Sequence, residues 1–128
     1  MERLRIRSGA PWESIVAYSR AIRVGDHIHV SGTTALKDGS LVGQDDAYQQ
    51  ARQCLSNISR ALESAGARMT DVTRTRIYVT DIDLWEDVGR AHREAFADVM
   101  PATSMVEISR LIDPAMLVEI EADAYVSK

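Results

Sequence analysis

The sequence predicts a single α+β domain, residues 1–128, in which a mixed six-stranded sheet carries two helices on one face. Two long segments repeat apolar residues at helical spacing, and shorter segments with alternating polar and apolar residues precede, separate and follow them. The order is strand, hairpin, helix, strand, helix, strand, strand, which suits a sheet with both helices on one side. A chain of 128 residues with 45% hydrophobic content is large enough for one core, and no linker or repeat divides it.

The chain is expected to start with an edge strand over residues 4–8. Gly9 and Pro11 end this strand, because neither residue favours a continued ladder. A loop containing Trp12 is expected to follow.

A hairpin is the next expected element. Segments 18–24 and 27–32 flank Gly25-Asp26, and glycine at the first position of a two-residue loop suits a type II′ turn. This register pairs Arg20 with Ser31, and side chains opposite each other in a hairpin share a face. The face expected beneath the helices carries Ala21, Ile28 and Val30. The opposite face, expected to meet a ligand or a partner subunit, carries Tyr18, Arg20, Ile22, Val24, His27, His29 and Ser31.

The two helices are predicted from their apolar spacing. The first spans residues 45–65 and is followed by Gly66, a typical C-terminal cap. The second starts at Asp83, which together with Glu86 resembles a capping box, and it ends before Pro101. The apolar seam of the first helix contains Ala47, Ala51, Cys54, Leu55, Ile58, Leu62 and Ala65. That of the second contains Trp85, Val88, His92, Ala95 and Val99.

Three further strands complete the expected sheet, at about residues 71–80, 104–109 and 117–126. In the first of them Thr73, Thr75, Ile77 and Val79 alternate with Arg74, Arg76 and Tyr78. The sheet face away from the helices would carry Arg20, Arg74, Arg76, Glu119, Glu121 and Asp123. This face is too polar for a core, but it suits pairing of charges across a subunit interface.

Composition excludes several classes of function. With 15 basic and 19 acidic residues the formal net charge is −4, which disfavours nucleic acid and membrane partners. The charged N-terminus and the absence of a long apolar run lead us to expect a cytoplasmic protein. Its one cysteine, Cys54, cannot form an intrachain disulfide. His27 and His29 share a strand face without a visible third ligand, so we expect no metal site, and we expect no cofactor.

Three segments then identify a resemblance that covers almost the whole chain. They read AYSRAIRVGDHIHVSGTT, DVTRTRIYVTDIDLW and PATSMVEISRLIDPAMLVEIEADA, and in this order and spacing they resemble the Rid family, also called YjgF/YER057c/UK114. The resemblance implies a chorismate-mutase-like subunit, a homotrimer, and a small-molecule cleft at each subunit interface. Its best-known members hydrolyse enamines or imines derived from amino acids, with release of ammonia and a 2-oxo acid.

The resemblance also implies site residues. Tyr18, Ser31 and Gly32 match positions that line the family cleft, and Glu119 matches a carboxylate that positions or activates the hydrolytic water. The arginine that grips the substrate carboxylate in the family is replaced here by Thr103. We therefore do not expect standard 2-iminopropanoate deaminase activity.

Three further residues complete the candidate site, namely Met105, Arg20 and His92. Arg20 either replaces the missing arginine or forms an interface salt bridge with an acidic residue at 119, 121 or 123. His92, on the seam of the second helix, is either a core or interface histidine or a group that serves acid and base chemistry.

The leading hypothesis is a Rid-like homotrimer whose interfacial clefts bind a small anionic metabolite and carry out hydrolytic or deaminase-like chemistry on a non-standard substrate. The loss of the arginine at position 103 favours an alternative, a non-catalytic metabolite-sensing or interaction protein. A third reading, a ribonuclease or translation inhibitor, predicts steeply salt-dependent RNA binding.

Overall fold

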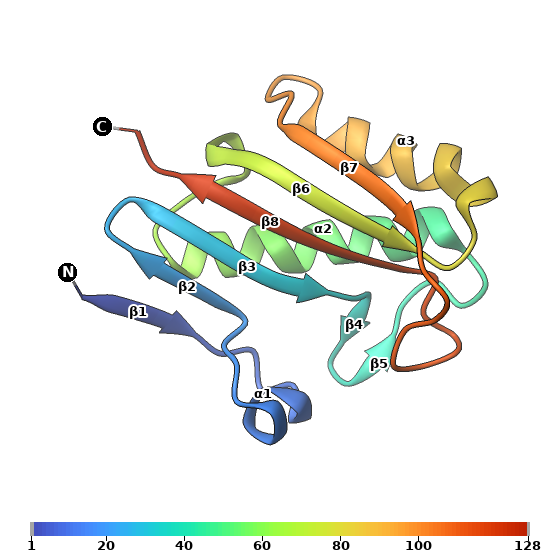
Figure 1. Ribbon diagram of the computed structural model, residues 1–128, viewed down its shortest axis with the longest axis horizontal. Helices are drawn as coiled ribbons and strands as arrows, with labels where there is room; N and C mark the ends of the chain where they lie inside the picture. Colours follow the sequence, from blue (N-terminus) through green and yellow to red (C-terminus); the bar gives the residue numbers. More distant parts are fainter. Residues whose placement is uncertain (1, 128) are drawn as a thin grey trace.

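The computed structural model describes residues 2–127 and confirms an α+β domain built on a six-stranded mixed sheet (Figure 1). The strand order is β1-β2-β3-β8-β6-β7, in which only β6 and β7 run parallel. The six strands are β1 (Arg3–Ile6), β2 (Ala21–Val24), β3 (His27–Thr33), β6 (Val72–Val79), β7 (Ala102–Glu107) and β8 (Val118–Tyr125). A small separate hairpin joins β4 (Leu36–Lys37) to β5 (Ser40–Leu41).

Both long helices lie on one face of the sheet, as expected. Helix α2 (Ala47–Ser64) and helix α3 (Trp85–Phe96) run side by side behind the strands in Figure 1. The Asp46 side chain caps α2 by accepting a hydrogen bond from Gln49 N at 3.0 Å. Gly66 follows the helix with a φ of 80°, the left-handed conformation that a helix C-terminus favours.

The hydrophobic core lies between the sheet and the two helices, with residues from β2, β3, β6 and β8. Strand β8 alternates strictly, so that Val118, Ile120, Ala122 and Ala124 are buried beneath the helices. The alternate residues Glu119, Glu121 and Asp123 face away from the helices and are half-buried. The polar face expected opposite the helices is therefore present. None of the helices among residues 2–127 has the length and apolar character needed to cross a membrane.

Two irregularities in the sheet alter the expected alternation. In β3 the register shifts between Val30 and Thr33, so that Ser31 and Gly32 together oppose one residue of β8. Both residues then lie on the face away from the helices, while Thr33 turns into the core. A second shift, between Val72 and Arg74, leaves Thr73 exposed, although regular alternation placed it with the buried residues of its strand.

The N-terminal loop and the second helix differ from expectation. Where a loop was expected around Trp12, Pro11–Val16 forms a short helix, α1, with Pro11 in its first turn. Helix α3 follows a 3₁₀ turn, Ile82–Leu84, which Asp81 rather than Asp83 caps. The helix ends at Phe96, which is buried. Trp85, at its start, is 56% exposed. Trp85 therefore does not belong to the core.

Candidate functional site

Four of the expected site residues lie together beside β3. Tyr18, Arg20, Gly32 and Glu119 line an open cavity of about 640 Å³, which the N-terminal segment around α1 closes on one side. We call this cavity the Glu119 groove. The β3 bulge turns Gly32 toward the groove, and the alternation of β8 turns Glu119 toward it. Strand register alone thus brings two segments that are far apart in sequence to one site.

The Glu119 carboxylate lies directly over Gly32. A Cβ atom added to Gly32 would lie only 2.7 Å from Glu119 Oε2, so no larger residue fits beneath the carboxylate in this position. No side chain or backbone group among residues 2–127 forms a hydrogen bond or ion pair with this carboxylate. Burial raises the pKa of Glu119 above its ordinary value of 4.5; the Arg20 charge partly opposes this shift and Glu121 adds to it. A half-buried carboxylate without a partner is suited to accept a proton.

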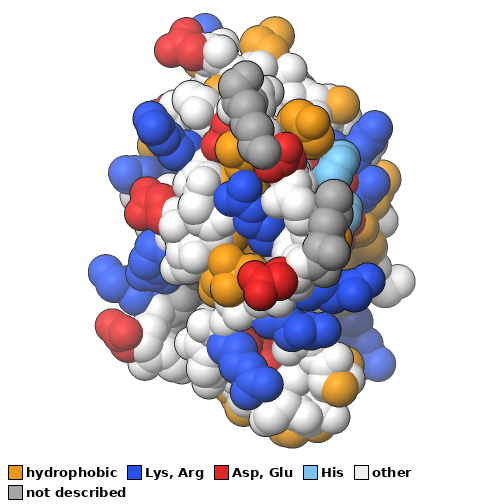
Figure 2. Space-filling view, turned by 90° about the vertical axis from the view of Figure 1, so that its left-hand side faces the viewer, with side chains coloured by type: hydrophobic (Ala, Val, Ile, Leu, Met, Phe, Trp, Pro, Cys, Tyr) orange, Lys and Arg blue, Asp and Glu red, His pale blue; other side chains and the backbone are white. Residues whose placement is uncertain are grey.

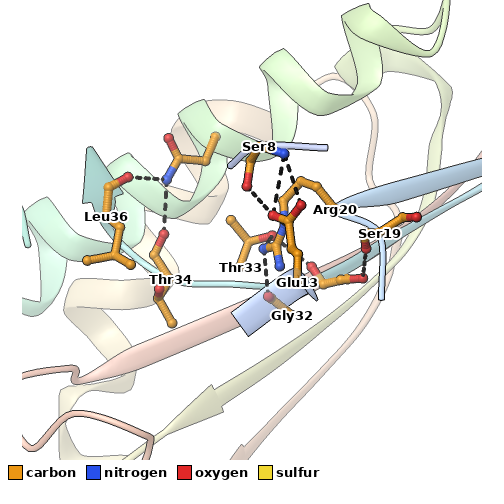
Figure 3. A network of polar contacts seen from close by, with 10 residues as sticks. Ser8, Glu13, Ser19, Arg20, Gly32, Thr33, Thr34 and Leu36 are labelled. Atoms are coloured by element: carbon orange, nitrogen blue, oxygen red, sulfur yellow. Dashed lines mark hydrogen bonds and ion pairs between the residues drawn. The ribbon is translucent and has the colours of Figure 1, made fainter. Parts of the chain in front are cut away.

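Arg20 forms hydrogen bonds and an ion pair with residues of its own subunit (Figure 3). Its Nη1 atom donates to the Gly32 carbonyl at 2.8 Å and to Thr33 Oγ1 at 3.0 Å. Its Nε atom is buried, has no hydrogen-bond partner among the described residues, and lies 3.8 Å from Glu13 Oε2. The carboxylate nearest to Arg20 in an ion pair is therefore Glu13, not one of the three acidic residues of β8 proposed from the sequence.

Ser31 borders a different depression. Its hydroxyl donates to the Ser19 carbonyl at 2.7 Å, and it lines a cavity of about 530 Å³ on the sheet face away from the helices. Tyr18 borders both cavities. The expectation that Ser31 shares one site with Gly32 and Glu119 is thus not met within one chain, because the bulge directs the two neighbouring residues to different depressions.

The remaining three candidates, Thr103, Met105 and His92, lie at the β7 edge of the sheet. The parallel register pairs Thr75 with Thr103 and Ile77 with Met105, which turns both β7 side chains toward the helices. Thr103 Oγ1 lies 2.8 Å from Thr75 Oγ1, which in turn lies 2.9 Å from His92 Nε2 on α3. Within one chain, these residues do not reach the Glu119 groove.

Comparison with known proteins identifies the family. A family model described as Endoribonuclease L-PSP matches residues 8–126. The uncharacterized protein SCO2049 of Streptomyces coelicolor is 36% identical over 94% of this chain and 90% of its own. The RutC family protein PH0854 of Pyrococcus horikoshii is 35% identical over 98% of each chain.

Two solved structures support the same family assignment. Rv2704 of Mycobacterium tuberculosis, a member of the YjgF/YER057c/UK114 family, superposes with a TM-score of 0.89 at 50% identity over 98% of this chain and 100% of its own. YyfA of Yersinia pestis, from the Rid family, superposes with a TM-score of 0.86 at 33% identity over 98% and 100% of the two chains. The chain belongs to the Rid family. Its subunit fold is therefore the chorismate-mutase-like fold that the sequence resemblance implied.

Sequence reasoning missed two residues of this Rid chain that contact candidate site residues. Glu13 is only 6% exposed, accepts hydrogen bonds from the Ser8 amide at 3.1 Å and from the Ser8 hydroxyl, and supplies the carboxylate beside Arg20 (Figure 3). Thr75 is fully buried between His92 and Thr103. A glutamate inside an expected loop and a threonine in a strand carry no signal of such roles, which only the packing creates.

The polar sheet face of the Rid chain is partly paired internally. Arg76 contacts Glu121 at 3.3 Å and Asp123 at 3.2 Å, and His29 Nδ1 lies 2.8 Å from Asp123 Oδ1. Within residues 2–127, no three histidine, cysteine or acidic side chains are grouped so as to hold a metal ion. Cys54 is fully buried, and burial raises the pKa of its thiol, so it stays protonated within the core.

Replacing Gly32 with alanine is expected to move the Glu119 carboxylate while changing the free energy of unfolding by less than about 1 kcal/mol. The added methyl group displaces the end of a flexible side chain rather than backbone atoms. The displaced carboxylate becomes more solvated, so its pKa falls toward 4.5, measured by carboxyl ¹³C NMR. Gly89→Ala, where an added Cβ meets nothing within 4 Å, is the control. An unchanged Glu119 pKa in Gly32→Ala would contradict the close contact.

Proposed function

We propose that this Rid chain forms a homotrimer in which the Glu119 groove of one subunit and the β7 edge of the next enclose a small metabolite. The carrying observation is the half-buried, unpaired Glu119 carboxylate over Gly32. The candidate residues form two groups, one around β3 and β8 in the middle of the sheet and one at its β7 edge. This separation supports an intersubunit site, because a neighbouring copy supplies what each group lacks. The polar sheet face supports charge pairing between subunits.

The proposed chemistry is hydrolysis of a carbon–nitrogen double bond. Glu119 accepts a proton from a water molecule as the water oxygen bonds to the imine carbon. The protonated carboxyl group returns that proton to nitrogen, which gives a carbinolamine. Glu119 then takes the proton of the carbinolamine hydroxyl and passes it to nitrogen as the C–N bond breaks, so that ammonia leaves and the carbonyl product forms. An enamine enters the same route after protonation at carbon. The raised pKa of Glu119 favours both steps, because the group must accept and then release a proton.

The structure changes the expected character of the ligand. Arg20 already donates to Gly32 and Thr33 and has the Glu13 carboxylate beside it, so it offers little free charge to an anion. Thr103 supplies a neutral hydroxyl in place of the family arginine. We therefore propose an imine or enamine that does not depend on a carboxylate clamp, in place of the anionic metabolite expected from the sequence.

The family model's description, Endoribonuclease L-PSP, raises an RNA-directed reading. Against it stand the net charge of −4 and the surface at the end of the sheet that carries both chain termini. There, basic and acidic side chains are interspersed rather than gathered into a basic stripe (Figure 2). RNA cleavage is accordingly an outcome that the experiment includes, not part of the proposal.

The test supplies two kinds of imine to the purified protein. An amino-acid oxidase generates 2-imino acids, an amine oxidase generates uncharged imines, and the rate of imine loss is followed with and without the protein. We expect acceleration with uncharged imines and little with 2-imino acids, together with a trimer in sedimentation velocity. A monomer would contradict the shared site. Ligand-dependent thermal shifts without turnover would favour the metabolite sensor, and salt-sensitive RNA cleavage would favour the ribonuclease.

A further inference from the structure

A continuous hydrogen-bonded chain runs from α3 to the exposed edge of the sheet. His92 Nε2 lies 2.9 Å from Thr75 Oγ1, and Thr75 Oγ1 lies 2.8 Å from Thr103 Oγ1. The middle member is fully buried, and the His92 ring packs against Phe96 with ring centroids 4.7 Å apart. Thr103 is exposed on β7, which has no neighbour on its outer side. The chain thus ends in one hydroxyl at the surface.

Burial lowers the pKa of His92 from its ordinary value of 6.5, so the ring is neutral at pH 7. A neutral imidazole has one N–H and one lone pair, and each threonine hydroxyl has a single proton. The hydrogen bonds that link His92, Thr75 and Thr103 therefore have one of two donor directions. Either His92 donates to Thr75 and Thr75 donates to Thr103, or Thr103 donates to Thr75 and Thr75 donates to His92.

Both directions leave the Thr103 oxygen able to accept a hydrogen bond from outside. In the first, the Thr103 proton points to the Pro101 carbonyl at 3.3 Å, and one lone pair of Thr103 remains free. In the second, the proton points into the protein, and Thr103 presents only lone pairs. A ligand N–H or O–H is matched in either case. A carboxylate, which has no donor, is matched only after the Thr103 proton leaves the Pro101 carbonyl in the first direction or Thr75 in the second.

The surroundings do not restore an affinity for negative charge. Arg74 and Arg76 belong to the opposite face of β6, since Thr75 between them turns toward the helices. Within the described residues, no lysine or arginine forms a hydrogen bond or ion pair with His92, Thr75 or Thr103. The polar group of a ligand at β7 therefore meets a neutral acceptor to which no basic side chain of the same subunit is bonded.

We infer that Thr103, positioned by Thr75 and His92, selects a ligand whose group facing β7 is uncharged and carries a hydrogen-bond donor, such as a primary amide or a hydroxyl. The inference rests on the proposed intersubunit site and names its substrate class as imines or carbonyl compounds bearing such a group. Thr103 makes the contact, while Thr75 and His92 act as positioning residues.

Three stable probes of nearly equal size test this selection: pyruvamide, methyl pyruvate and pyruvate. Each is titrated into the full-length protein, and Kd is measured from ¹H–¹⁵N NMR shifts. We expect pyruvamide to bind about fivefold more tightly than methyl pyruvate, which has no donor, and pyruvate to bind most weakly. Thr103→Val should abolish the preference for pyruvamide, Thr103→Ser should retain it, and Thr103→Arg should reverse it toward pyruvate.

Thr75→Val separates positioning from structure. Valine keeps the shape of the buried side chain but removes the hydroxyl that links His92 to Thr103. The ratio of the Kd for pyruvate to the Kd for pyruvamide should therefore fall while the protein stays folded. An unchanged ratio would refute the positioning role. Equal binding of pyruvamide and pyruvate by the wild-type protein would refute the selection while the site stands. If no probe shifts the amide signals of Gly32 and Glu119, the proposed site itself fails.

Discussion

Glu119→Gln is expected to lower the rate of imine hydrolysis by about 100-fold or more, the usual contribution of a positioned acid or base. Glutamine keeps the size and polarity of the side chain over Gly32 but cannot take a proton from water. Because the carboxylate has no hydrogen-bond or ion-pair partner among residues 2–127, its replacement breaks no hydrogen bond or ion pair. The loss should therefore appear in the rate, with the fold and the oligomer unchanged by circular dichroism and sedimentation.

Glu121→Gln is the matched control for this variant. Glu121 lies two positions along β8 on the same sheet face, but it contacts Tyr78 and Arg76 rather than Gly32. It should retain most of the wild-type rate. Equal losses in the two variants would indicate a general charge effect and would count against a proton-accepting role for Glu119.

The raised pKa of Glu119 predicts how the wild-type rate and the stability of the fold depend on pH. The wild-type rate should rise with pH through this pKa, above 4.5, because the base must be ionised. For stability the sign is opposite. The folded state holds the proton more tightly than the unfolded state, so the stabilisation is complete at low pH and is lost as pH rises through the raised pKa. Glu119→Gln should thus gain stability relative to wild type as pH rises from 4.5 through the raised pKa, measured by urea unfolding. A parallel pH profile for both proteins would contradict this.

Gln50→Leu is expected to lower the free energy of unfolding by about 2 kcal/mol or more. Gln50 on α2 is fully buried, and both ends of its amide are used. Its Nε2 donates to the carbonyls of Gly43 at 3.1 Å and Ala115 at 2.9 Å, and its Oε1 accepts from Leu117 N at 2.8 Å. Leucine fits the space but leaves the Ala115 carbonyl and the Leu117 amide, both part-buried, without their partner, while the Gly43 carbonyl still accepts from Asp46 N at 2.9 Å. Each group left unpaired costs about 1–3 kcal/mol.

Gln49→Leu provides the control, since Gln49 is the exposed neighbour on the same helix and makes no side-chain hydrogen bond among the described residues. It should change the free energy of unfolding by less than about 0.5 kcal/mol in urea titrations. In Gln50→Leu, amide exchange should also accelerate at Leu117 and the start of β8, because Gln50 fastens the loop that leads into that strand. A loss below about 1 kcal/mol would show that water replaces the amide.

Much of the fold could be predicted from local pattern. The register of the β2–β3 hairpin, the spans of α2 and β8, and the polar face of the sheet follow from Gly25, from helical spacing and from alternation, all of which act over a few residues. Prediction failed where tertiary packing decides the outcome. Trp85 follows the apolar spacing of α3 yet is exposed, whereas Phe96 at the other end of the same helix is buried.

The sequence by itself determined the family, the last strand with its alternating polar and apolar residues, and the presence of a glutamate at position 119 together with a threonine at position 103. These depend on residue identity and order, which are read directly. The central position of β8 came from the structure. The tertiary structure alone decided that Glu13 accompanies Arg20, that a bulge brings Gly32 beneath Glu119, and that Thr75 joins His92 to Thr103. Each links residues from separate elements, and such contacts depend on register and packing, which leave no local mark in the chain.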